Sequence, residues 1–144
     1  KVKRDDTVGE RIDELLGFLP LFEEPDRSFV TKWAGGAPTS DGATTMPFPV
    51  YAEDVAEFFR LAGGPFWCDY AYRPAEAGRL LQDDAFIARA TLDEVKTLLT
   101  YCVRGERFCD GHWEAVLQAG RISAILRRLA ELRGRAGGSA RTAP

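Results

Sequence analysis

Residues 91–132 read TLDEVKTLLTYCVRGERFCDGHWEAVLQAGRISAILRRLAEL, and this stretch decides the fold. It opens on Thr91 and Glu94, the two ends of a capping box, in which a hydroxyl and a carboxylate satisfy the first free amides of a helix. Apolar residues then recur at helical spacing as far as Val103, and Gly105 ends the run. The pattern predicts a central helix that is the most buried in the chain.

Two further helices follow within the same stretch. Asp110 stands where it could cap a short helix that holds Trp113 and ends at Gly120. The last helix carries Ile122, Ile125, Leu126, Leu129 and Leu132 on one face, with arginines outside. After Arg133 the apolar periodicity stops, so residues 134–144 are expected to form a flexible tail.

The N-terminal half predicts helices on either side of a small hairpin. A second capping box, Thr7 to Glu10, is expected to start a helix that Pro20 closes. Residues 28–33 and 47–51 have the composition of two strands, joined by a long surface loop rich in glycine, alanine and threonine. Helices are then expected over 53–62 and 74–81, and another begins at Asp83 or Asp84.

Length and composition agree with these elements. A chain of 144 residues with 45% hydrophobic and 28% charged residues is typical of one globular domain. We therefore predict a mainly α fold: a single-domain helical bundle of about six helices, with a small β-hairpin inserted after the first helix. The domain is expected to span residues 1–133, with the hairpin and its loop at 28–51.

Charge, cysteines and hydropathy limit the environment. Residues 5–60 hold twelve acids and four bases, a net charge of −8, whereas residues 104–144 hold eight bases and four acids, a net charge of +4. Three cysteines at irregular spacing do not form a disulfide framework. No apolar run reaches the length of a membrane span. We expect a cytoplasmic protein with reduced thiols and no membrane partner.

The string LLTYCVRGERFCDGHW, followed after a short helix by GRISAILRRLAEL, resembles the C-terminal signature of a bacterial family of small, uncharacterised helical domains of unknown function. The resemblance covers residues 91–132. It implies a small helical bacterial domain and carries no catalytic residue across.

Specific chemistry has few candidates. Cys68, Cys102, Cys109 and His112 would supply a Cys3His set for zinc, but structural zinc sites usually show two close pairs of ligands, and Cys102 lies on an apolar stripe. A Cys109 thiol activated by His112 would need an orienting acid such as Glu106 or Asp110. No phosphate-binding glycine motif occurs. We expect no metal and no cofactor.

The joint between the central helix and the next one is the strongest candidate site. Charged or imidazole side chains crowd its nine residues, Arg104 to His112, and could line a groove for a protein partner or a small anionic ligand. The candidate binding residues are Arg104, Glu106, Arg107, Asp110, His112 and Trp113. We therefore predict first a binding or protein-interaction module with a charged groove at 104–113, and an enzyme is the less favoured class.

Two other functions stay open. A nucleic-acid-binding regulator could use the helix-turn-helix-like arrangement, and it would require Arg104, Arg107, Arg127 and Arg128 to form one exposed face. A hydrolase-like enzyme would use Glu106, Asp110 or His112, and it would require the imidazole and an acid to share a concave pocket. The structural alternative is that the joint only holds helices together.

Overall fold

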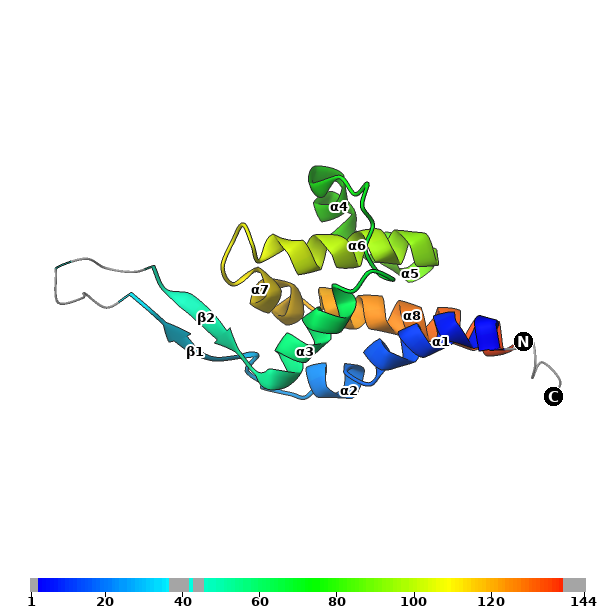
Figure 1. Cartoon of the computed structure of the whole chain (residues 1–144), viewed down its shortest axis with the longest axis horizontal. Helices are drawn as coiled ribbons and strands as arrows, with labels where there is room; N and C mark the ends of the chain where they lie inside the picture. The colour runs from blue at the N-terminus through cyan, green and yellow to red at the C-terminus, as the bar shows by residue number, and fades with distance from the viewer. Residues whose placement is uncertain (1–2, 37–41, 43–45, 139–144) are drawn as a thin grey trace.

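The computed structural model describes residues 3–36, 42 and 46–138, and the fold is mainly α with a two-stranded antiparallel hairpin, as predicted (Figure 1). The elements in chain order are α1 (Lys3–Leu16), α2 (Leu19–Phe22), β1 (Val30–Ala34), β2 (Phe48–Tyr51), α3 (Glu53–Ala62), α4 (Pro74–Leu81), α5 (Asp84–Arg89), α6 (Leu92–Gly105), α7 (His112–Gln118) and α8 (Arg121–Gly138).

Helix α6 lies at the centre of the fold and contacts α3, α4, α7 and α8. Its start is the predicted capping box, since the Thr91 hydroxyl accepts from the Glu94 amide and the Glu94 carboxylate accepts from the Thr91 amide. Val95, Leu98 and Leu99 are fully buried. Local sequence signals therefore fix both where this helix begins and which face it buries.

The first helix differs from the prediction. Helix α1 already includes Lys3, so Thr7 does not cap it, and it ends at Leu16 rather than at Pro20. Pro20 instead lies in the first turn of α2, a position where a proline loses no helical hydrogen bond. The apolar face is as expected, because Ile12 and Leu15 belong to the core.

The base of the hairpin joins the core. Strands β1 and β2 pair antiparallel, with Trp33 opposite Pro49 and Ala34 opposite Phe48, and an irregularity between Val30 and Lys32. Phe29 and Val30 are buried, whereas Trp33 and Phe48 are about half exposed. In Figure 1 the hairpin extends away from the helices. Most of the predicted loop between the strands lies outside the described residues.

The last helix is longer than predicted, because α8 continues past Arg133 to Gly138. An ion pair between Arg133 and Asp13 joins it to α1, with a nitrogen-to-oxygen distance of 3.0 Å. Residues 139–144, which include the rest of the predicted flexible tail, lie outside the described residues.

Candidate functional site

Glu106, at the end of α6, caps the start of helix α7. Its carboxylate accepts hydrogen bonds from the backbone amides of Gly111 at 2.9 Å and Trp113 at 2.8 Å, and from the Tyr51 hydroxyl at 2.9 Å. The Tyr51 hydroxyl in turn accepts from the Glu114 amide at 3.3 Å. These bonds satisfy amides that a helix start leaves free, so Glu106 stabilises the fold at the joint.

The predicted cap, Asp110, is therefore wrong. Asp110 is exposed, and the residue before α7 is Gly111, whose φ of 92° lies in the left-handed region that favours glycine. This left-handed residue directly precedes α7, and its own amide donates to Glu106. Among the described ion pairs, none joins Asp110 or Glu106 to Arg104 or Arg107.

Trp113 packs into the joint between α6 and α7. Its ring stacks on Phe59 with centroids 4.3 Å apart and planes 1° apart, and it packs on Tyr51 at 5.1 Å. The indole nitrogen donates to the Val103 carbonyl at 3.1 Å. Phe108, by contrast, is 80% exposed. Trp113 is thus partly buried and packs against the core, while Phe108 is a surface residue.

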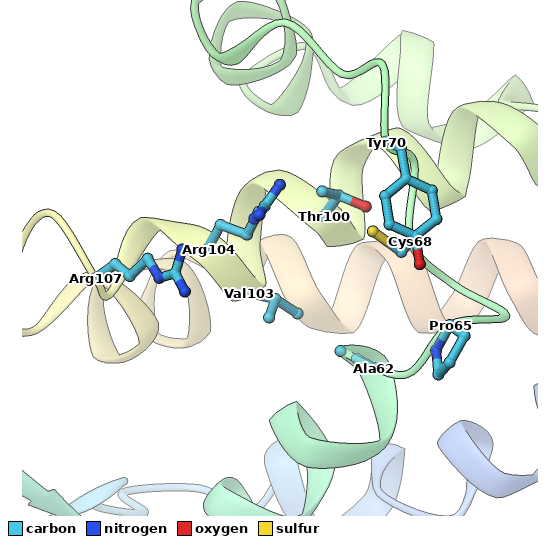
Figure 2. A pocket seen from close by; sticks show the side chains of 9 residues that line it. Ala62, Pro65, Cys68, Tyr70, Thr100, Val103, Arg104 and Arg107 are labelled. Carbon is cyan, nitrogen blue, oxygen red and sulfur yellow. The ribbon is translucent and has the colours of Figure 1, made fainter.

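Arg104 and Arg107 line one pocket at the C-terminal end of α6, which we call the arginine pocket (Figure 2). It has a volume of about 340 Å³. Figure 2 shows the two arginines on one side, with Cys68 and Tyr70 entering from the segment between α3 and α4. The lining residues are Ala62, Gly63, Pro65, Cys68, Tyr70, Thr100, Val103, Arg104 and Arg107.

The walls of the arginine pocket combine apolar, polar and cationic groups. Thr100 is buried, and its hydroxyl donates to the Lys96 carbonyl and accepts from the Asp69 amide. The hydrogen bond from the Asp69 amide to Thr100 holds the segment that carries Cys68 and Tyr70 against α6. The lining contains no acidic residue, so the charge of the pocket comes from the two guanidinium groups.

Most arginines elsewhere in the described part of the chain are engaged with acids. Arg127 pairs with Glu23, Arg121 pairs with Asp84, and Arg128 pairs with Glu131. Arg128 is also 94% buried and donates to the Ala90 carbonyl at 2.8 Å. The four arginines that a nucleic-acid regulator would need therefore do not form one exposed face.

His112 lines a second pocket, which we call the aromatic pocket, on another side of the α6 end. Its volume is about 430 Å³, and its lining residues are Tyr72, Pro74, Tyr101, Gly105, Phe108, Cys109 and His112. No residue of this lining is acidic, so His112 does not share the pocket with the carboxylate that a hydrolase would require. The pocket is built mainly from rings.

The imidazole of His112 is held by packing. It meets the Tyr101 ring edge-on at 5.2 Å, and a Cβ added to Gly105 would lie 2.4 Å from its Nε2 atom. Among the described atoms, Nε2 is buried without a hydrogen-bond partner. Burial lowers the pKa of His112, and the Glu106 carboxylate partly opposes that shift.

The three cysteines are free and lie in three environments. Cys102 is fully buried, and burial raises the pKa of its thiol to about 12. Cys68 lines the arginine pocket, and Cys109 is exposed at the edge of the aromatic pocket. The described residues contain no group of three or more histidine, cysteine or acidic side chains that could hold a metal ion.

Sequence reasoning found Arg104 and Arg107 but missed the residues that complete their pocket. Tyr70 is 81% exposed and Cys68 half-buried, and both come from the aromatic segment 66–72 between α3 and α4. Only Trp67 in that segment is fully buried.

The fold and this joint define a small, mainly helical domain with a projecting hairpin. The chain belongs to a family of unknown function (DUF6508), whose model matches residues 7–135. This confirms the resemblance to an uncharacterised family and extends it from 91–132 to nearly the whole chain. No curated protein and no solved structure matches the chain.

Within the described residues, every helix is too short or too polar to traverse a lipid bilayer.

Proposed function

We propose that the chain is a binding module that recognises an anionic group in the arginine pocket. One observation carries the proposal: Arg104 and Arg107 line the same pocket, and neither belongs to an ion pair among the described residues. Unpaired guanidinium groups in a concave site are the usual means of binding a carboxylate or phosphate.

The electrostatics of the arginine pocket also support anion binding. The guanidinium of Arg104 lies 5.6 Å from the centroid of the Tyr72 ring, and a cation over an aromatic face is attracted to it without being neutralised. The stacked ring limits the motion of the side chain, so less conformational entropy is lost when an anion binds. Arg107 is exposed and can turn toward the same anion.

The alternatives have less support. A nucleic-acid regulator would need exposed, unpaired arginines to bind phosphates, but Arg127 pairs with Glu23, and Arg128 is buried and pairs with Glu131. A hydrolase would need an acidic side chain in the same pocket as His112, and the lining of the aromatic pocket contains none. Because the three cysteines are free, the proposal assigns the module to a reducing compartment, the cytoplasm.

The test is a titration with small anions. Inorganic phosphate and citrate are added to the intact chain at low ionic strength, where screening is weakest, and binding is followed by calorimetry and by amide chemical shifts. We expect saturable binding, with shifts at Thr100, Val103 and Arg104, that is lost in Arg104→Ala/Arg107→Ala.

The matched control is Arg79→Ala/Arg89→Ala. It removes the same charge from two exposed arginines that lie in neither pocket and form no ion pair among the described residues. The control should bind anions as the wild type does. Equal loss of binding in both double variants would mean that only net charge matters, and the proposal would be abandoned.

A further inference from the structure

The arginine pocket and the aromatic pocket adjoin each other. Arg104 lines the first pocket, and its guanidinium lies over the ring of Tyr72, which lines the second. The chain makes a second link, because Arg107 lines the first pocket and its neighbour Phe108 lines the second. The end of α6 therefore presents a cationic pocket and an apolar pocket side by side.

The rims of both pockets expose aromatic rings to solvent. Tyr70, at the arginine pocket, is 81% exposed, and Phe108, at the aromatic pocket, is 80% exposed. Scattered exposed hydrophobics are ordinary, but these two flank a pair of adjoining pockets that also hold unpaired arginines. Tyrosine, phenylalanine and arginine are the residues enriched where proteins bind other proteins.

The floor of the aromatic pocket is shaped to remain open. The ring of His112 packs directly on Gly105, so any larger residue at 105 would push the ring outward. Tyr101 and Pro74 add further apolar wall. An inorganic anion would use only the arginine pocket and leave this surface wet, whereas a ligand with both an acidic and an apolar group would use both pockets.

We infer that the site binds an acidic peptide segment of a partner protein, in which one or two carboxylates lie next to a bulky apolar side chain. The carboxylates bind Arg104 and Arg107, and the apolar side chain enters the aromatic pocket between Tyr72 and Phe108. This inference rests on the proposed function, since it names the ligand of the same arginines. Charge complementarity selects the acidic part, and the ring-lined walls select the apolar part.

The experiment is a selection from a random peptide library displayed on phage, with the intact chain immobilised. We expect the enriched peptides to share an aspartate or glutamate within a few positions of phenylalanine, tryptophan or leucine. A synthetic peptide of the enriched sequence is then measured by fluorescence polarisation against wild type, Arg104→Ala/Arg107→Ala and Phe108→Ser.

The two variants separate the two halves of the site. The arginine variant should weaken binding about tenfold or more, equivalent to ~1.4 kcal/mol, and should no longer distinguish the peptide from its glutamine analogue. Phe108→Ser should weaken the peptide several-fold but leave its preference for carboxylate over amide intact. Since Phe108 is a surface side chain, this variant is expected to fold, and a melting curve checks that it does.

Several results would overturn the inference. These are a library that enriches no peptide, an enriched consensus without acidic residues, or affinity that neither variant changes. A short DNA or RNA oligonucleotide that binds more tightly and competes for the same arginines would also overturn it. If phosphate and citrate still bind in an arginine-dependent way, the proposed function survives and only the peptide inference fails; if they do not bind, both fail.

Discussion

Replacing Glu106 by alanine should destabilise the fold rather than remove a ligand contact. The carboxylate accepts three hydrogen bonds, from the Gly111 and Trp113 amides and the Tyr51 hydroxyl. Hydrogen bonds to charged groups contribute roughly 1.5–3 kcal/mol each when buried, and loss of a helix cap about 1 kcal/mol. Because the site is only half-buried, we expect Glu106→Ala to lower the free energy of unfolding by about 3 kcal/mol.

Glu106→Gln gives a graded version of the same test. The amide oxygen can still accept from Trp113 and Tyr51, but the amide nitrogen faces the Gly111 amide, donor against donor. We therefore expect a loss of about 1.5 kcal/mol. Tyr51→Phe removes the hydroxyl that bridges Glu106 and the Glu114 amide, so the double variant should lose less than the sum of the single losses.

The assay is urea unfolding followed by tryptophan fluorescence, with thermal melting as a second measure. For a chain of this size, 3 kcal/mol corresponds to a drop in melting temperature of about 10 °C. Asp110→Ala is the control, because it removes a neighbouring exposed carboxylate that caps nothing. If Glu106→Ala lowers the free energy of unfolding no more than Asp110→Ala does, the capping role is refuted, and Glu106 is again a candidate for ligand contact.

Three further predictions concern the same joint. Trp113→Ala should lower the free energy of unfolding by about 3 kcal/mol, since it removes a ring stacked on Phe59. Trp113→Phe keeps an aromatic ring there but loses the indole hydrogen bond and part of the ring, so its loss should be smaller, at least about 1 kcal/mol. Unchanged urea midpoints would contradict the packing role. Burial lowers the pKa of His112 in the folded state, so below about pH 6.5 the unfolded chain binds the proton more readily, and stability should fall as the pH falls through that range. This slope should be smaller in His112→Phe, and an identical slope in both proteins would show that other groups cause it. Cys109 should react with a thiol reagent in the native protein, while Cys102 should react only when the protein unfolds. The reason is that Cys102 is fully buried and that burial raises the pKa of its thiol to about 12. Mass spectrometry of the labelled peptides gives the two rates, and equal rates would contradict this prediction.

The predictions from sequence were confirmed where a structural signal is local. The capping box of Thr91 and Glu94 is formed by residues three apart, so its geometry follows once the helix exists. Asp83 caps α5 in the same way, by accepting from the Phe86 amide. The prediction at Thr7 was wrong because a capping motif can also occur inside a helix that neighbouring turns extend, as α1 extends back to Lys3.

The candidate site was predicted in composition but not in arrangement. Its residues all lie near the end of α6, yet Arg104 and Arg107 line one pocket, His112 lines another, and Glu106 and Trp113 serve the core. Helical spacing places residues on faces, but it does not say which distant segment covers each face. The segment of Cys68 and Tyr70 makes that choice on one side of α6.

The sequence by itself determined the mainly helical class, the buried face of α6 and the hairpin, because periodicity, capping and β-branched composition act over a few residues. Only the tertiary structure decided the role of each charged side chain at the joint. The bond from Tyr51 to Glu106 joins residues 55 positions apart, and no local spacing encodes it. That bond and the amides of α7 engage Glu106. Among the described residues, Arg104 and Arg107 then form no ion pair, and both cations line a pocket instead of pairing within the joint.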